Sequence, residues 1–273
     1  MAIIMKHLTL LLLLISTLEI SASLTKNPIL EGLKHDIENI DQSVKQSAEV
    51  IDLNNYIYYE NTYGPADSTF LKGYFVNNRL VKIIKKIRTA TFFESTTFYL
   101  KGNEIIATKT HKGIYYYTID SLTQEISFHK DSLMKVYQAT LYYFNGSRLI
   151  DIEEINKDFE NTPANRYLNE GLKYQSVFIN YQNNIELINL LSGKWINSSN
   201  PKEAYFFKDM TLVKTKNGFV SFYQFIAIDK YLVLNSQSSK NEIAWLKINS
   251  IDNHSMIVTN QKDGSRIKLK REE

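Results

Sequence analysis

One short pattern recurs along this sequence and constrains its fold more than any other feature. An aromatic residue and a bulky apolar neighbour precede two or three turn-forming residues, and a pair of aliphatic residues follows. The pattern occurs at residues 74–81, 99–106 and 143–150, and in a weaker form at 206–213. Asn and Gly tolerate the positive φ of tight hairpins, and β-branched and aromatic residues favour strands. The pattern therefore predicts successive β-hairpins in an antiparallel meander, and its unequal spacing disfavours a solenoid or propeller.

Two segments carry a helical pattern instead. Apolar residues recur every three or four positions in 30–53, opposite a charged face, as in an amphipathic helix. Thr162-Pro163 predicts the start of a second helical stretch, a connector that continues to about residue 190. The first helix is expected to cover one face of the sheet, with partner binding as the alternative. These elements predict a mainly β chain with a few helices (α+β), divided into domains 24–190 and 191–273.

The C-terminal domain alternates eight short strand-like runs with polar turns, which suits an up-and-down barrel. Gly193-Lys194-Trp195 is similar to the Gly-x-Trp opening of lipocalin-like domains. With a Lys-Asn-Gly turn, a Lys-Asp-Gly turn and a basic last strand, residues 191–273 resemble the small lipocalin-like domains of exported bacterial proteins. The resemblance implies that Trp195 closes the barrel floor and packs against Arg271, so both residues have structural roles.

A ligand inside this barrel would contact Tyr223, Phe225 and Trp245. A ligand pocket needs at least ~300 Å³, and an empty apolar cavity of that size costs about 7 kcal/mol. A small barrel without disulfides has little stability to spare. The sequence therefore favours an interior that is filled by side chains, for which the candidates are Trp195, Leu212, Ile226 and Leu246.

The first 23 residues have the pattern of a secretory signal peptide. Lys6 and His7 precede an apolar run at residues 8–15, and Ser21-Ala22-Ser23 supplies a cleavage site. The alternative is a short N-terminal anchor, although the run is shorter than the ~20 residues that span a bilayer. We therefore expect an exported protein of the periplasm, cell surface or extracellular space, with no membrane span in the mature chain. The absence of Cys suits a bacterial envelope and excludes disulfides and cysteine nucleophiles.

Motifs for catalysis are missing from the sequence. The five His residues are scattered, and neither a Gly-x-Ser-x-Gly elbow nor a Gly-rich phosphate loop occurs. The acidic cluster of Asp151, Glu153 and Glu154 is interpreted as a solvated strand end, and the basic run of residues 82–88 as a solvated strand face. A net charge of +3 gives no support for nucleic acid as a partner.

Two functional hypotheses follow. The first is a noncatalytic envelope or secreted protein that acts through contacts with an unknown envelope protein or in a structural role. Its support is the density of aromatic residues in the strands, because Tyr suits interfaces. The alternative is a carrier or sensor of a small apolar ligand held in the C-terminal barrel. Neither hypothesis assigns catalytic residues, a metal or a cofactor, and both leave the oligomeric state open.

Overall fold

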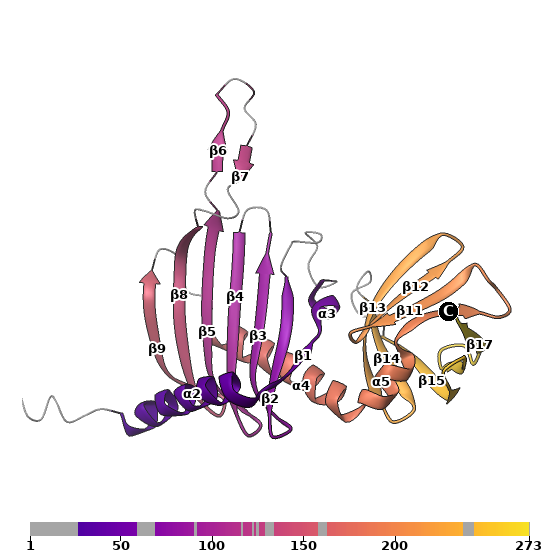
Figure 1. Ribbon diagram of the computed structural model, residues 1–273, viewed down its shortest axis with the longest axis horizontal. Helices are drawn as coiled ribbons and strands as arrows, with labels where there is room; N and C mark the ends of the chain where they lie inside the picture. Colours follow the sequence, from indigo (N-terminus) through magenta and orange to yellow (C-terminus); the bar gives the residue numbers. More distant parts are fainter. Residues whose placement is uncertain are drawn as a thin grey trace, which may run out of the picture.

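The computed structural model describes residues 27–58, 69–89, 92–115, 117–121, 123, 126–128, 134–157, 163–236 and 243–272. The predicted signal peptide at residues 1–23 lies outside these ranges. The described chain is mainly β, with a large antiparallel sheet, a helical connector and a closed C-terminal barrel, as the sequence predicts (Figure 1). Within the described residues, no helix combines the length and apolarity needed to cross a bilayer.

The N-terminal sheet has seven antiparallel strands in the order β1-β2-β3-β4-β5-β8-β9. Its strands are β1 (Glu49–Asp52), β2 (Phe70–Val76), β3 (Arg79–Arg88), β4 (Phe92–Lys101), β5 (Glu104–Tyr115), β8 (Met134–Asn145) and β9 (Arg148–Lys157). The short strands β6 (Tyr117–Ile119) and β7 (Ile126–Phe128) pair with each other and project from one end of the sheet (Figure 1).

The repeated pattern forms hairpins at all four of its occurrences. The turns between β2 and β3, β4 and β5, and β8 and β9 use positive φ at Asn77, Asn78, Gly102 and Gly146. Each of these three hairpins also has a register shift after the turn, which leaves the second aliphatic residue of the pattern without a partner; these residues are Val81, Ile106 and Ile150. The weaker copy in the barrel pairs without a shift. The pattern thus encodes a hairpin together with a β-bulge.

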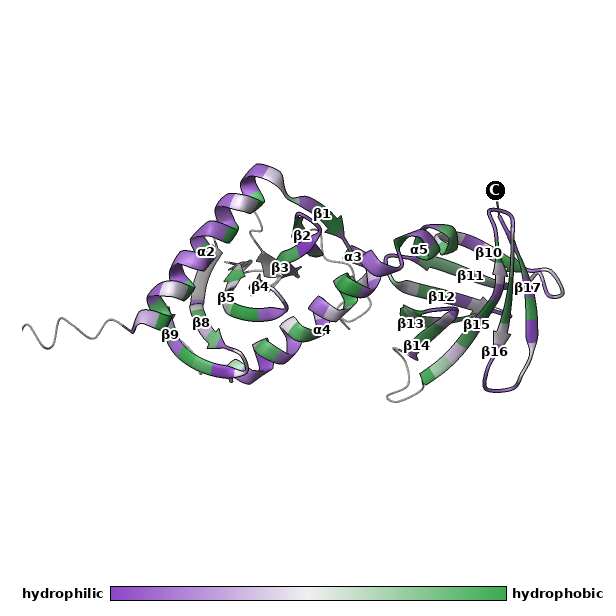
Figure 2. Ribbon diagram, turned by 90° about the horizontal axis from the view of Figure 1, so that it is seen from below, coloured by the Kyte–Doolittle hydropathy of each residue, from purple (hydrophilic) through white to green (hydrophobic). Residues whose placement is uncertain are grey.

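A helix packs on each face of this sheet (Figure 2). On one face α2 (Pro28–Ser47), capped by the Asn27 side chain, packs Leu33 against Tyr99 and Tyr143. On the other face α4 (Ala164–Asn183) packs its buried aromatic side chains, including Phe178, against the main core. The prediction that the first helix covers the sheet is therefore confirmed.

The predicted helix 30–53 extends too far, however. The chain becomes extended at Ala48, and Glu49–Asp52 then form the edge strand β1, which pairs with β2. The pairing with β2 outweighs the local helical period. A short helix, α3 (Asn54–Tyr58), follows β1.

The close approach of α4 to the sheet depends on Gly171. A Cβ atom at this position would lie 2.5 Å from Ile105 Cδ1 and 2.6 Å from Phe98 Cδ1. We expect Gly171→Ala to lower the free energy of unfolding by about 1–3 kcal/mol, because the packed side chains must shift. Gly32→Ala in α2 is the matched control, since a Cβ there has nothing within 4 Å, and it should stabilise by up to ~1 kcal/mol. Urea unfolding measures both variants, and changes of the same sign would contradict this account of Gly171.

The C-terminal barrel is closed by pairing of its first and last strands. It follows α5 (Ile185–Leu191) and has the strands β10 (Gly193–Asn197), β11 (Glu203–Lys208), β12 (Thr211–Lys216), β13 (Phe219–Ile228), β14 (Tyr231–Ser236), β15 (Ile243–Ile251), β16 (Ser255–Asn260) and β17 (Arg266–Arg271). Trp195, Leu212 and Leu246 are buried in the core as expected. Ile226 is only partly buried, because it alternates with the inward-facing Phe225 and therefore faces outward, so the expectation that it fills the interior is wrong.

The barrel and the sheet share one continuous hydrophobic core. The Asn180 amide joins them, since its Nδ2 donates to the Ala227 carbonyl (2.7 Å) and its Oδ1 accepts from the Ala227 N–H (3.0 Å). Gln224 Nε2 donates to the Tyr56 carbonyl at 2.9 Å, and Asn55 Nδ2 donates to Asp209 Oδ2 at 2.8 Å. These bonds place β13 and the turn between β11 and β12 against α3 and α4.

Candidate functional site

A groove of about 450 Å³ lies where the barrel meets the N-terminal domain. Its lining comes from α3, α4 and three neighbouring barrel strands: Tyr56, Lys173, Gln224, Phe225, Ile226, Val233, Leu234, Asn235 and Ile243. Most of these side chains are apolar, and Gln224, Asn235 and Lys173 add a few polar groups. A concave apolar site with few polar groups at a domain junction is typical of a small-molecule site.

The structure separates the three ligand contacts predicted from sequence. Phe225 is 2 % exposed and lies 5.8 Å from Phe207, ring centroid to ring centroid, inside the barrel. Tyr223 is partly buried against the same core. Trp245 is 42 % exposed and lies edge-on to Tyr231. The expectation that all three share the barrel interior is therefore wrong for Trp245, because strand alternation on β15 places its neighbour Leu246 inside.

Trp195 and Arg271 lie opposite each other on β10 and β17, where the barrel closes. The Arg271 guanidinium sits over the Trp195 ring at 4.6 Å from its centroid, the geometry of a cation–π contact. Trp195 Nε1 donates to the Leu191 carbonyl at 2.7 Å, and Arg271 Nη2 donates to the Leu190 carbonyl. Both side chains thus attach the end of α5 to the barrel floor.

A buried carboxylate lies inside the barrel. Glu203 is 5 % exposed and accepts hydrogen bonds from Asn197 Nδ2 (2.8 Å), Tyr205 Oη (2.9 Å) and Lys214 Nζ (2.9 Å). Burial raises the pKa of Glu203, but the donors outweigh burial and leave the pKa below its usual value. Burial and the same carboxylate raise the pKa of Tyr205. Because every partner of Glu203 is a donor, the carboxylate is held ionised and has a structural role.

A second group of polar residues lies on the face of the large sheet that α4 covers. Lys85, Thr96, Thr110 and Thr140 stand opposite one another across four neighbouring strands, and all are less than 10 % exposed. Glu170 of α4 forms an ion pair with the Lys85 ammonium. Glu94 lies 3.7 Å from the same ammonium, and Tyr174 Oη donates to Glu170 at 3.3 Å. The charge of Lys85 is thus matched by two carboxylates.

Several hydroxyls beside this ion pair are buried without a hydrogen-bond partner among the described residues. They belong to Thr96 and Thr108 on the sheet and to Tyr167 on α4. Buried polar groups normally form hydrogen bonds with protein or water, so the space between α4 and the sheet at these hydroxyls suits ordered water or a small polar molecule.

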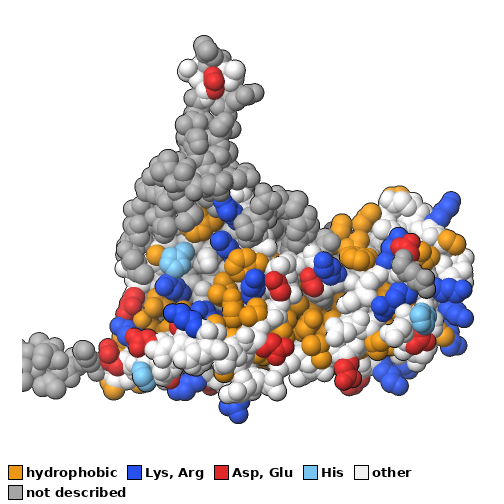
Figure 3. All heavy atoms as spheres, viewed as in Figure 1, with side chains coloured by type: hydrophobic (Ala, Val, Ile, Leu, Met, Phe, Trp, Pro, Cys, Tyr) orange, Lys and Arg blue, Asp and Glu red, His pale blue; other side chains and the backbone are white. Residues whose placement is uncertain are grey.

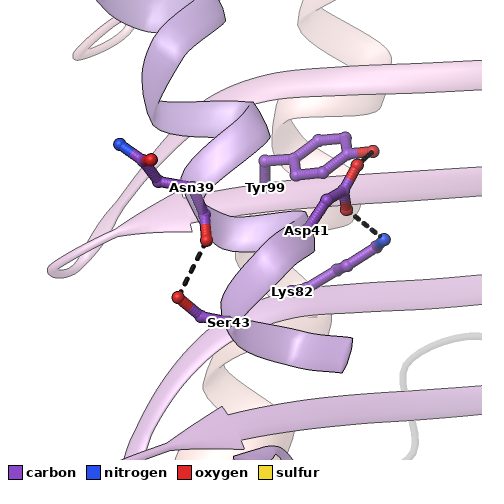
Figure 4. A network of polar contacts seen from close by, with 5 residues as sticks. All are labelled: Asn39, Asp41, Ser43, Lys82 and Tyr99. Carbon is purple, nitrogen blue, oxygen red and sulfur yellow. Dashed lines mark hydrogen bonds and ion pairs between the residues drawn. The ribbon is translucent and has the colours of Figure 1, made fainter. Parts of the chain in front are cut away.

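A second groove, polar and of about 540 Å³, lies between α2 and the turns of the β2–β3 and β4–β5 hairpins. Its charged rim residues include Asp36 and Lys101, which pair at 2.8 Å. Beside it, Asp41 accepts hydrogen bonds from Lys82 (2.6 Å) and from Tyr99 Oη (3.3 Å) (Figure 4). Burial and Asp41 raise the pKa of Tyr99. These matched contacts attach α2 to the sheet and leave this groove a weaker candidate than the junction groove.

Sequence reasoning missed the junction groove, whose wall combines Tyr56 and Lys173 with β13. It also missed the Lys85–Glu170 pair, because the two residues are far apart in the chain. Among the described residues, no group of three or more His, Asp or Glu side chains is placed to hold a metal ion. No family model, curated protein or solved structure matches this chain.

Proposed function

We propose that this chain is a noncatalytic binding protein whose junction groove takes a small, largely apolar ligand. The observation that carries the proposal is the apolar groove of about 450 Å³ between the two β units. Its volume is within the range of ligand sites, roughly 300–1,000 Å³. The site proposed here lies beside the barrel, whose interior is occupied by buried side chains such as Trp195 and Leu212, whereas Phe225 belongs both to this core and to the groove wall. Export and the resemblance of the barrel to lipocalin-like domains remain part of the proposal.

The polar residues of the groove fit an orienting role. Gln224 is fixed by its bond to the Tyr56 carbonyl, so it is a rigid part of the wall. The Lys173 ammonium lies over the rings of Tyr56 and Tyr174, at 5.8 and 5.9 Å from their centroids. A ligand with an apolar body and one polar end would match this distribution.

Nile red, a neutral apolar dye, tests the groove in the full chain. We expect saturable binding with a blue-shifted emission, and a loss of affinity of at least tenfold in Ile243→Asp, because a charge would be placed at the groove wall. Ile228→Asp is the matched control: Ile228 is also an exposed isoleucine on the barrel, 45 % against 62 % for Ile243, but lies outside the groove. Nonsaturable binding, or equal losses in both variants, would refute the groove as the site.

A protein partner is the second candidate for the same surface. Ile243, in the groove wall, is 62 % exposed, and Trp245, opposite the lining residue Val233, is 42 % exposed. Exposed aromatic and aliphatic side chains are typical of interfaces. A partner would insert an apolar side chain where the dye binds. If purified chain shows no saturable dye binding, while Trp245→Ala releases a copurifying envelope protein, this second candidate is favoured over the first.

A further inference from the structure

The hairpin between β12 and β13 exposes two apolar side chains next to its turn. Phe219 is 79 % exposed and Val220 is 53 % exposed, directly after the turn residues Asn217 and Gly218. Consecutive residues on a strand point to opposite faces, so exposure of both means that the tip extends beyond the barrel wall. Figure 1 shows the two strands projecting from the barrel.

Three turns at this end of the barrel, all among the described residues, are basic. Because neighbouring strands are antiparallel, the turns β10–β11, β12–β13 and β16–β17 share one end, and the Asn217 N–H donates to the Lys202 carbonyl at 3.2 Å. The exposed charges of these turns are Lys202, Lys216, Lys262 and Arg266, against the single acid Asp263. The three turns at the opposite end carry Asp209, Asp229 and Asp252 against Lys208 and Lys230. Arg271 and Lys194 also lie at that end, where Lys194 pairs with Glu272 at 2.6 Å. Figure 3 shows Lys and Arg side chains at the outer edge of the barrel.

We propose that this tip docks the protein on an anionic lipid membrane, with Phe219 and Val220 entering the headgroup region and the lysines around them facing the anionic headgroups. A convex tip can bury little surface against another protein, whereas a stable protein interface needs roughly 1,200 Å² or more. A membrane accepts a convex apolar tip, and long basic side chains need no fixed partner geometry there. This inference is independent of the junction groove.

The absence of cysteine in the chain permits a local test. The variant Val220→Cys, labelled on its thiol with the fluorophore NBD, reports the environment of the tip in the full chain. Ile228→Cys is the control, because it lies at the other end of the same strand and is 45 % exposed. With vesicles of phosphatidylglycerol and phosphatidylcholine in equal amounts, we expect a blue shift for the label at 220 and none for the label at 228. No shift at 220, or equal shifts at both positions, would overturn the proposal.

Matched substitutions test the apolar tip and the basic residues around it separately. Phe219→Ser is expected to weaken vesicle binding roughly tenfold, while Phe206→Ser, at a 40 % exposed position on β11, leaves it unchanged. Lys216→Ala is expected to weaken binding about fivefold at low salt, and Lys230→Ala at the opposite end is its control. Binding that is equally strong to pure phosphatidylcholine, or losses that are equal in test and control variants, would refute the anionic membrane as the occupant.

Discussion

Trp195→Ala is expected to lower the free energy of unfolding by about 3–5 kcal/mol, the typical cost of truncating a fully buried Trp. Trp195 is 0 % exposed, and its removal leaves a cavity at the barrel floor. It also removes the ring on which the Arg271 guanidinium rests and the Nε1 bond to the Leu191 carbonyl. Among the described residues, Arg271 Nε is already buried without a hydrogen-bond partner, so the loss of the ring leaves the guanidinium poorly compensated.

The matched control is Trp245→Ala, which removes the chain's other Trp from the outer wall of the same barrel. Because Trp245 is 42 % exposed, we expect a cost below about 1.5 kcal/mol. Urea unfolding followed by circular dichroism measures both variants. If the two substitutions cost the same, Trp195 is not the residue that closes the floor.

Glu170→Ala is expected to destabilise the protein by about 3 kcal/mol, because it leaves the buried Lys85 ammonium with Glu94, at 3.7 Å, as its remaining carboxylate partner among the described residues. The Lys85 side chain is 9 % exposed and that of Glu170 is 20 % exposed, so neither charge is well hydrated. The double variant Lys85→Met/Glu170→Leu removes both charges and is expected to recover most of the loss.

An exposed ion pair provides the control for this experiment. Lys194 and Glu272 lie 2.6 Å apart, with side chains 48 % and 43 % exposed, so Glu272→Ala should cost less than about 1 kcal/mol. Chemical unfolding of all variants completes the comparison. A double variant that is less stable than Glu170→Ala would show that the buried pair itself is net stabilising and would contradict the prediction.

Local chemistry explains why the hairpins could be predicted from sequence. Asn77-Asn78 and Gly102 supply positive φ between β-favouring residues, and that preference acts within a few residues of the turn. The helical period of α2 was likewise visible, although it continues in the sequence to residue 53 and the helix ends at Ser47. The strand β1 was missed, because the pairing of Glu49–Asp52 with β2 is a contact between segments far apart in the chain.

Which side chains of a strand point into the core was harder to predict. Alternation allows either of two neighbours to point inward, so the sequence alone did not choose between Phe225 and Ile226 on β13. The tertiary structure made the choice: Phe225 is 2 % exposed in the core, whereas Ile226 is only partly buried, and both line the junction groove. Bulges such as the one at Ile106 shift the register and change which residues share a face.

The sequence by itself determined the hairpins, the two long helices and a barrel of short strands, because turn conformations and hydrophobic periods are local properties. The tertiary structure alone decided that Lys85 meets Glu170, that Trp245 lies outside the barrel and that Tyr56 and Lys173 form a groove with β13. The physical reason is that each of these features depends on how α4 and α3 dock against strands distant in the chain. How a helix docks depends on the packing of complete surfaces against each other, and no short segment of sequence encodes that packing.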